Sequence, residues 1–425
     1  MKLRAHCRSS FLSLFLSFVS WCTLTVQGST LGQRDFIQLT SEQILALATA
    51  TDPVANVDTN NPASHLSKIL IPRAVGSENI TLVREYIVSA LKVLDWHVEE
   101  DTFTDNTPYG PRSFTNIIAT KDPTASRRVI LSAHYDSKFF PNYPDNQFVG
   151  ATDSAAPCAM MLDLAETLSP LLDQRKQRLE DGYDDDDDDD DDGDEDVADT
   201  TLQLVFFDGE EAFKDWTDTD SVYGARHLAG KWSSTYIAPN SKRRLLGHAS
   251  LTELSTIEHI ILLDLLGAPN PTIRSYFIDT AWLFDAMISA ETRIKDAGAL
   301  DEAETSTNFR SFFLPRTGSG NQYNYGYIGD DHVPFLQKGV NILHIIAYPF
   351  PRVWHTLGDD ALALDVLTMR RWNMILRVFM SEYLNLRPEI SQPPPKHDHL
   401  QRSASELVRF NLVIDVSNSV NHGAQ

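Results

Sequence analysis

The sequence predicts an α/β fold, a three-layer sandwich in which helices flank a central mixed, mostly parallel β-sheet. Two patterns carry this prediction. Short apolar strands alternate with longer segments of helical periodicity, which is typical of a sheet covered by helices on both faces. The first strands follow one another closely, so that edge of the sheet is expected to be antiparallel. The 425 residues are 42% hydrophobic and 10% aromatic, enough apolar material for a large core.

Two helices are expected before the sheet begins. The first is short and spans Ser41–Ala50. The second follows Ser77, a good N-cap residue, and carries apolar residues at helical spacing as far as Leu94. Glu78 lies in its first turn, where a negative charge is favourable. Trp96–Phe103 then alternates between apolar and polar residues, which indicates a half-buried strand.

The remaining elements are predicted from apolar runs and amphipathic segments. Strands are expected at Phe114–Thr120, Arg128–Ala133, Thr201–Phe207, Ile257–Leu263 and Val340–Ile346. Helices are expected at Ala155–Leu172, Ser221–Trp232, Trp282–Ala297 and Leu362–Leu386. The first and the last of these helices have a clear apolar face, as helices packed on a sheet do.

The chain is expected to divide into a signal peptide and one folded domain with an insertion and a tail. The expected bounds are 1–28 for the signal peptide, 35–387 for the folded domain, 180–200 for a disordered acidic insertion within it, and 388–425 for a disordered tail. The net charge of -23 would repel nucleic acid, which we exclude as a partner. Fourteen of the acidic residues lie in 181–199, and the run Asp184–Asp192 repels itself and buries nothing. Loose calcium binding by this run is a weaker alternative.

The N-terminus has the pattern of a secretory signal. Lys2, Arg4 and Arg8 precede the apolar stretch Phe11–Val26, which is too short for a comfortable membrane span. Cleavage is expected after about Gly28, with an uncleaved signal anchor as the alternative. The protein is therefore expected to be secreted or to reside in the lumen of the secretory pathway, with no stable membrane span after cleavage.

Cysteine usage and one sequon bear on this localisation. Cys7 and Cys22 leave with the signal, so Cys158 stands alone and cannot form an internal disulfide. Its apolar neighbours predict a buried, inert thiol. Asn79 opens an Asn-Ile-Thr glycosylation sequon close to an expected helix start.

Acidic and histidine residues gather where apolar strands end or helices begin. In chain order they are His134, Asp153, the pair Glu210 and Glu211, Asp264 and His355. Ligand sites of open α/β sheets lie at the carboxyl ends of the strands. Each residue alone is commonplace, since a strand-end aspartate usually caps a turn. Together they form a set that zinc prefers, because zinc takes histidine nitrogen and carboxylate oxygen and keeps one position open in catalytic sites.

Glu210 and Glu211 are the most informative pair. One can ligate a metal while its neighbour stays free as a general base, because a carboxylate close to other carboxylates can have a raised pKa. Gly209 permits the tight turn that directs both side chains inward. The spacing of the five candidate positions leaves both a one-metal and a two-metal site open.

Seven motifs surround these residues. They are AHYDSK at 133–138, GATDSAAPCAMML at 150–162, FFDGEEAF at 206–213, SVYGARHLA at 221–229, LLDLLGAPNP at 262–271, DDHVPF at 330–335 and YPFPRVWHT at 348–356. These motifs resemble those of the zinc aminopeptidase superfamily and, much more closely, the glutaminyl-peptide cyclotransferase family. The resemblance runs from about Ile71 to Leu386, and implies a zinc aminopeptidase-like fold with residues 35–387 as a zinc-dependent catalytic domain.

The resemblance also implies a role for each site residue. The zinc ligands that it implies, for one ion per chain, are Asp153, Glu211 and His355. The pocket-lining positions that it implies are Trp216, Ile328, Phe350 and Trp354. Glu210 falls on the acid/base glutamate of the family, and Asp264 and Asp330 on an acidic pair hydrogen-bonded to it. One position departs from the family: secreted members often have a cysteine where this chain has Ala133, so the bridge to Cys158 is absent.

The implied reaction is the cyclisation of N-terminal glutamine, and also of N-terminal glutamate, to pyroglutamate. Peptides or proteins with N-terminal glutamine are the expected partners, and a monomer is expected. The main alternative is a secreted zinc aminopeptidase, in which His134 and Asp264 hold a second metal bridged by Asp153. A non-catalytic secreted binding domain is a further alternative, and the intact set of candidate ligands argues against it.

Overall fold

The computed structural model places the folded domain and leaves three predicted segments aside. The described residues are 33–181, 197–238, 251–301, 309–315 and 328–390. The expected signal peptide, the aspartate run and residues 391–425 of the expected tail lie outside these ranges. From Asp35 onward the described residues belong to one compact unit.

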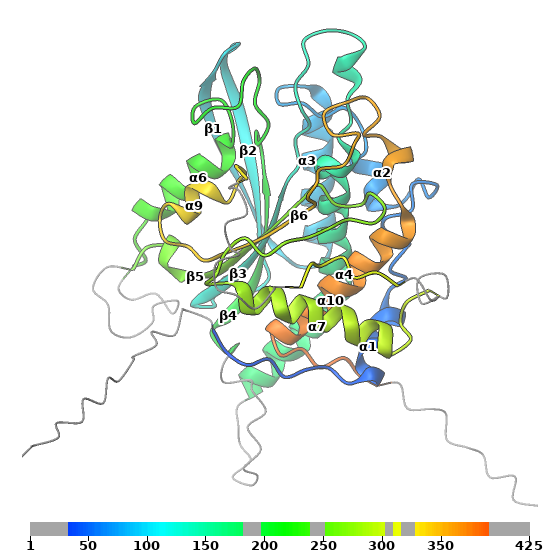
Figure 1. Cartoon of the computed structure of the whole chain (residues 1–425). Coiled ribbons are helices and arrows are strands. Elements are labelled where there is room, and N and C mark those ends of the chain that lie inside the picture. Colours follow the sequence, from blue (N-terminus) through cyan, green and yellow to red (C-terminus); the bar gives the residue numbers. More distant parts are fainter. Residues whose placement is uncertain (1–32, 182–196, 239–250, 302–308, 316–327, 391–425) are drawn as a thin grey trace, which may run out of the picture. The chain divides into compact units, whose positions relative to one another are not determined.

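In the described part of the chain, six strands form one mixed sheet in the order β1-β2-β4-β3-β5-β6 (Figure 1). Their bounds are β1 His97–Thr107, β2 Gly110–Thr120, β3 Arg127–His134, β4 Thr200–Phe207, β5 Ile257–Asp264 and β6 Ile342–Ile346. Strands β3, β4, β5 and β6 pair in parallel. Strand β2 pairs antiparallel with both β1 and β4. The mixed sheet and its antiparallel edge were both expected from the sequence.

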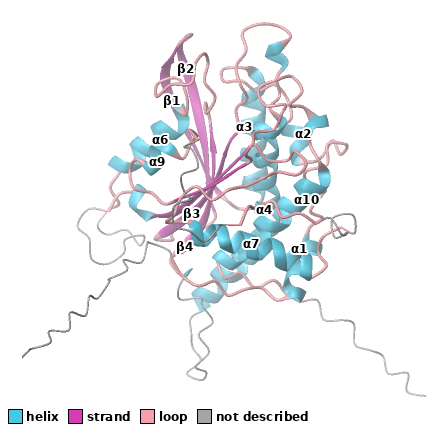
Figure 2. Ribbon diagram, viewed as in Figure 1, coloured by secondary structure: helices cyan, strands magenta, loops and turns pink. Residues whose placement is uncertain are grey.

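Helices cover both faces of this sheet (Figure 2). The helix bounds are α1 Ser41–Ala50, α2 His65–Ile69, α3 Glu78–Val93, α4 Ala156–Asp181, α6 Tyr223–Ser234, α7 Ala281–Asp296, α9 Val333–Leu336 and α10 Val366–Tyr383. Leu131 and Leu204 face a core shared with α4, α7 and α10, whereas their neighbours Ile130 and Val205 face a core shared with α6 and α9. The three-layer prediction is therefore confirmed.

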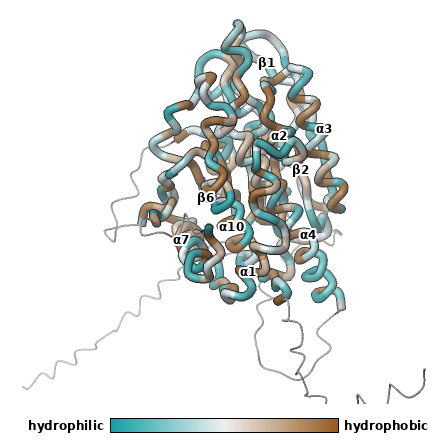
Figure 3. The backbone as a smooth tube through the Cα atoms, turned by 90° about the vertical axis from the view of Figure 1, so that its right-hand side faces the viewer, coloured by the Kyte–Doolittle hydropathy of each residue, from teal (hydrophilic) through white to brown (hydrophobic). Residues whose placement is uncertain are grey.

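The burial of strands on both faces explains their continuous apolar runs. Every residue of β4, β5 and β6 is buried. In Figure 3 hydrophobic colour gathers around β6, while α1 and α3 alternate between hydrophobic and hydrophilic residues. None of the helices within the described ranges combines the length and apolar character needed to cross a membrane.

Several element bounds differ from the expectations for local reasons. Strands β1 and β2 are longer than predicted, because they continue as a polar hairpin closed at Gly110, which has φ +89°. The last helix begins at Val366 rather than Leu362, because the Asp365 side chain caps it by accepting from the Thr368 N–H. Helix α4 runs through Pro170 to Asp181, past the predicted end at Leu172. Helix α2 was not predicted.

The parallel strands place their carboxyl ends at one edge of the sheet. His134 ends β3, Phe207 ends β4, Asp264 ends β5 and Ile346 ends β6. The loops that follow these strands therefore converge on the same region.

Candidate active site and metal centre

Three segments that are distant in sequence bring Asp153, Glu211 and His355 together. Asp153 lies in a short π-helical turn before α4, Glu211 follows β4, and His355 lies in the loop after β6. His355 adopts φ +55°, an uncommon conformation for a residue with a side chain. Gly209 has φ +72°, and a β-carbon there would lie 2.4 Å from the Phe114 ring. Glycine is therefore needed for the turn that directs the two glutamates inward.

The ligand atoms of these three residues have the spacing of a zinc site. His355 Nε2 lies 3.3 Å from Asp153 Oδ2 and 3.2 Å from Glu211 Oε1. Both oxygens are buried and accept no hydrogen bond from the described residues. Tetrahedral zinc with bonds of about 2.0–2.2 Å separates its ligand atoms by about 3.3–3.6 Å. The donor types, the spacing and the two unsatisfied oxygens all fit zinc.

The charges of the triad depend strongly on one another. Burial opposes ionisation of Asp153, but the hydrogen bond with His134 and the nearby His355 ring hold its pKa well below the usual range. Burial lowers the pKa of His355, whereas the carboxylates of Asp153 and Glu211 beside its Nε2 raise it to about 9. Without a metal, His355 is therefore a cation between two carboxylates.

Glu210 is buried beside the triad in a strongly acidic environment. Burial raises the pKa of its carboxyl well above the usual value, and the charges of Asp330 and Glu211 add to the rise, while His134 opposes it. The Asp136 carboxylate fixes the backbone of this turn, because it accepts the N–H of Glu210 at 3.1 Å and that of Glu211 at 3.4 Å. A carboxyl with a raised pKa at a fixed position is suited to exchange protons.

Asp330 lies close enough to raise the pKa of Glu210 through its charge, but the expected hydrogen bonds from Asp264 and Asp330 to Glu210 are absent among the described residues. Asp264 Oδ1 accepts from Ser154 Oγ at 2.6 Å and from the Leu265 N–H at 2.8 Å. Burial raises the pKa of Asp264 to about 6, and the charge of Asp330 contributes. The link between Asp330 and Glu210 is therefore electrostatic rather than a direct hydrogen bond.

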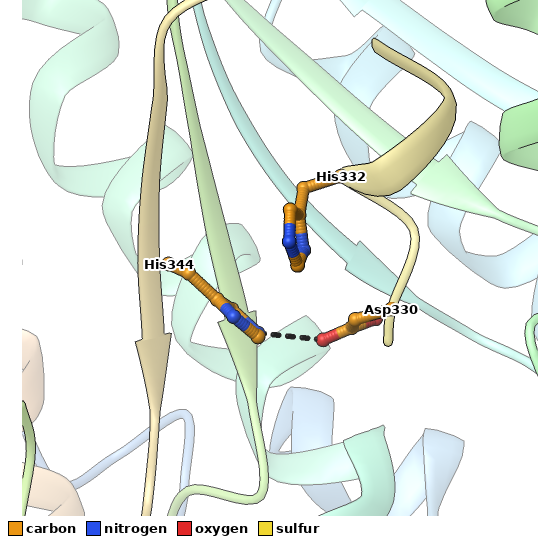
Figure 4. A group of neighbouring side chains, drawn as sticks. All are labelled: Asp330, His332 and His344. Carbon is orange, nitrogen blue, oxygen red and sulfur yellow. Dashed lines mark hydrogen bonds and ion pairs between the residues drawn. The ribbon is translucent and has the colours of Figure 1, made fainter. Parts of the chain in front are cut away.

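Asp330 belongs to a buried cluster with two histidines (Figure 4). Its Oδ2 lies 2.7 Å from Nε2 of His344, which comes from β6. Burial opposes ionisation of Asp330, but this hydrogen bond lowers its pKa. The His332 ring lies over His344 with centroids 4.4 Å apart. Asp264 and Asp330 thus have pKa values displaced in opposite directions, as paired carboxyls in active sites often do.

The second possible metal set consists of His134, Asp153 and Asp264. His134 Nε2 lies 3.0 Å from Asp153 Oδ1 and 3.5 Å from Asp264 Oδ1. Burial opposes protonation of His134, but the nearby carboxylates of Asp136, Asp153 and Asp264 raise its pKa well above the usual value. The Asp264 oxygen nearest His134 already accepts two hydrogen bonds. The geometry is that of a histidinium held among carboxylates.

A cavity of about 420 Å³ opens onto the triad and Glu210. All four residues predicted to line a pocket do so: Trp216, Ile328, Phe350 and Trp354. The Trp354 ring stacks on His355 with centroids 3.9 Å apart, which orients the imidazole. Asp264 also lines the cavity, whereas Asp330 lies buried behind it. The wall combines aromatic and aliphatic side chains with carboxylates and lysines. Apolar walls with a few placed polar groups are common in small-ligand sites.

Several residues of the site were missed in the sequence. Lys138 lines the cavity and lies 3.2 Å from Glu211 Oε2. Its place in the AHYDSK motif was the available signal. Asp136 stands in the same motif, whereas His344 had no such signal. The contacts of Asp136 and His344 could not be predicted, because they join segments that are distant in sequence.

Two further predictions can be compared with the structure. Cys158 is fully buried, and burial raises the pKa of its thiol to about 12, consistent with an inert residue. Asn79 lies in the first turn of α3, as expected, and its side-chain amide donates to the Pro72 carbonyl at 2.7 Å. Its glycosylation stays a prediction.

Comparisons with known proteins identify the family of this chain. The model of Peptidase family M28 matches residues 116–380. The chain is 42% identical over 326 residues to the glutaminyl-peptide cyclotransferase of Bos taurus, covering 76% of this chain and 81% of the relative. It is 42% identical over 320 residues to the protein of the same name from Drosophila melanogaster, covering 75% and 79%.

A solved structure is also similar. The crystal structure of Macrostomum lignano glutaminyl cyclase superposes with a TM-score of 0.67 at 35% identity, covering 84% of this chain and 97% of the other. Both sequence and fold therefore lead to the same group of enzymes. The chain belongs to the glutaminyl-peptide cyclotransferase family, within the fold of the M28 peptidases.

Proposed function

We propose that this protein is a secreted, zinc-dependent enzyme that converts the N-terminal glutamine of peptides and proteins, and also N-terminal glutamate, to pyroglutamate. With glutamine, ammonia is released. One observation carries the proposal: three zinc-type ligand atoms converge beside a buried glutamate whose pKa is strongly raised. Membership of the cyclotransferase family supports this reaction.

Asp153, Glu211 and His355 would hold one zinc ion per chain. Their atoms match the donor types and the spacing of a catalytic site with three protein ligands. When bound, zinc would supply a Lewis acid for the side-chain carbonyl oxygen of the substrate glutamine.

Glu210 is the proposed acid/base. Its carboxylate takes a proton from the substrate α-amine as the nitrogen bonds to the side-chain amide carbon. It returns a proton to the amide nitrogen as the bond from that nitrogen to carbon breaks. The lactam closes, ammonia leaves, and Glu210 regains its starting state. The raised pKa allows both transfers near neutral pH.

Asp264 and Asp330 would keep Glu210 positioned and protonatable. The charge of Asp330 helps to raise the pKa of Glu210, and hydrogen bonds with Ser154 and His344 hold Asp264 and Asp330 in place. Trp216 and Trp354 shape the cavity so that the glutamine side chain folds back toward its own amine. Ring closure gains greatly from such orientation.

A glutamine dipeptide tests the proposal directly. Purified protein with zinc is incubated with it, and ammonia and free amino acids are measured. Ammonia without free glutamine is expected. Free glutamine without ammonia would contradict cyclisation and identify an aminopeptidase.

The rival two-zinc aminopeptidase rests on the set His134, Asp153 and Asp264. The two hydrogen bonds on Asp264 Oδ1 favour the one-zinc assignment. Metal analysis separates the two: about one zinc per chain is expected, and two would favour peptide hydrolysis.

Secretion is proposed from the N-terminal signal pattern. Expression in a secreting eukaryotic cell, followed by sequencing of the mature N-terminus from the medium, tests it. A mature N-terminus close to residue 29 is expected, and retention of the apolar stretch in cell membranes would favour the signal anchor.

A further inference from the structure

Arg73 is a fully buried arginine in the segment between α2 and α3. Its Nε donates to the Tyr135 carbonyl at 2.7 Å and its Nη1 donates to the Val149 carbonyl. Its Nη2 lies 3.2 Å from the Gly150 carbonyl and 3.4 Å from the carbonyl of Asp153 itself. One guanidinium therefore reaches four backbone carbonyls, three of them in the turn that carries a proposed zinc ligand.

The same turn is held from its other side by Asp359. The Asp359 carboxylate accepts the Thr152 N–H at 2.9 Å, and its backbone carbonyl accepts the Ala151 N–H at 3.0 Å. Asp359 lies only four residues after His355. Arg73 therefore fixes carbonyls of the turn. Asp359, from the segment that also carries the proposed ligand His355, fixes two of its N–H groups.

The turn needs this support because its backbone is irregular. Asp153 and Ser154 have non-helical φ and ψ inside the π-helical turn. Gly150 has φ +55°, and a β-carbon there would lie 2.1 Å from the Asp153 carbonyl oxygen. Carbonyls that do not follow a helical ladder need other donors when they are buried. Arg73 supplies them, and neither a lysine nor an apolar residue offers the same planar set of donors.

We propose that Arg73 is a positioning residue for zinc, an inference that rests on the zinc site proposed above. By fixing the turn 149–153 it directs Asp153 Oδ2 toward Glu211 and His355. It touches neither the substrate cavity nor Glu210, so its effect is on metal affinity and on the rate of the chemical step.

The test uses full-length protein with Arg73→Lys, which keeps a buried charge, and Arg73→Met, which removes it. Zinc affinity is measured by competition with a chromophoric chelator, and the visible spectrum of the cobalt-substituted protein reports ligand geometry. Both variants are expected to bind zinc about 10–100-fold more weakly, as when groups that orient metal ligands are removed. At saturating zinc, kcat is expected to fall, with KM within about twofold of wild type, as when an interaction specific to the transition state is lost.

Arg175→Lys is the matched control. Arg175 is also buried and donates to two backbone carbonyls, those of Thr200 and Val197, at the opposite end of β4 from the site. The Arg175→Lys variant is expected to have a lower melting temperature, with unchanged zinc affinity and cobalt spectrum. The comparison separates a loss of stability from a loss of metal positioning.

Two outcomes would contradict the role proposed for Arg73. If Arg73→Lys retains wild-type zinc affinity and cobalt spectrum, the inference is wrong. If both Arg73 variants fail to fold while Arg175→Lys folds, Arg73 is structural and the inference is also wrong. The zinc site itself is tested separately by Asp153→Ala in the wild-type background. Loss of zinc there upholds the proposed site whatever Arg73 does, whereas a wild-type protein that binds no zinc overturns the proposed function.

Discussion

Glu210 and Glu211 are neighbours in the chain with different surroundings. Glu211 faces His355 and Lys138, two cationic partners. Glu210 faces the charge of other carboxylates, and its pKa rises. Chemically identical side chains thus reach separate proposed roles, metal ligand and proton carrier, through their environments.

Glu210→Gln tests the proton-carrier role. The amide keeps the shape of the side chain but cannot accept the amine proton, so turnover is expected to fall by about 10²–10⁴-fold. Zinc content should stay at the wild-type level, because Glu211 and the other ligands are unchanged. Glu85→Gln, on the exposed side of α3, is the control and should behave as wild type. A Glu210→Gln protein with normal kcat would refute the assignment.

Zinc affinity is expected to depend on pH through His355. Its pKa of about 9 in the metal-free chain means that zinc must displace one proton below that pH. Affinity should therefore rise about tenfold per pH unit between about pH 6 and 9, and level off above. Calorimetry in buffers of different ionisation enthalpy should show about one proton released. An affinity that is constant across this range would contradict the prediction.

At the scale of elements, the site depends on turns at the ends of strands and at the start of α4. Gly209 and Gly150 both have positive φ, and a β-carbon at either position would meet neighbouring atoms closer than 2.5 Å. These turns convert the regular carboxyl edge of the sheet into a set of inward-facing ligands.

Gly209→Ala tests whether the turn after β4 requires glycine. The added methyl group would meet the Phe114 ring, and alanine disfavours φ +72°. A loss of about 2–4 kcal/mol in the free energy of unfolding is expected from the two effects together, with loss of turnover. Denaturant unfolding measures it. Gly230→Ala in α6, which meets no atom within 4 Å, should instead be neutral or stabilise by up to about 1 kcal/mol.

At the scale of the whole molecule, the proposed zinc would join three distant segments, those before α4, after β4 and after β6. A ligand that binds only the folded state stabilises it by mass action, by about 2.7 kcal/mol at 100 times its Kd. A chelator should therefore lower the melting temperature by about 4 °C, and added zinc should restore it. His355→Ala should show no such dependence on the chelator. A wild-type melting temperature that ignores chelator and zinc alike would argue against the site.

How far the site was predictable differs from residue to residue. Asp153, Glu210 and Glu211 became candidates because they lie beside a strand end or helix start that hydrophobic patterning marks, and His355 because it lies in the loop after a predicted strand. The resemblance to family motifs then selected these four residues from the wider set. The expected hydrogen bonds from Asp264 and Asp330 to Glu210 are absent among the described residues. Asp264 Oδ1 instead accepts from Ser154 and the Leu265 N–H, and Asp330 pairs with His344. Arg73 had no local signal, since its four acceptors lie 62 to 80 residues further along the chain.

The sequence by itself determined the α/β fold, the antiparallel edge and the set of candidate ligands, because these follow from hydrophobic periodicity and from residues next to strand ends. Tertiary structure alone decided which donors face one another. The ligand atoms of Asp153, Glu211 and His355 meet, and the two carboxylate oxygens among them accept no hydrogen bond from the described residues. His134 instead pairs with the other Asp153 oxygen, and Asp264 accepts from Ser154. The physical reason is that hydrogen bonding and charge at a buried site depend on groups brought together from distant segments, and local patterning carries no record of them.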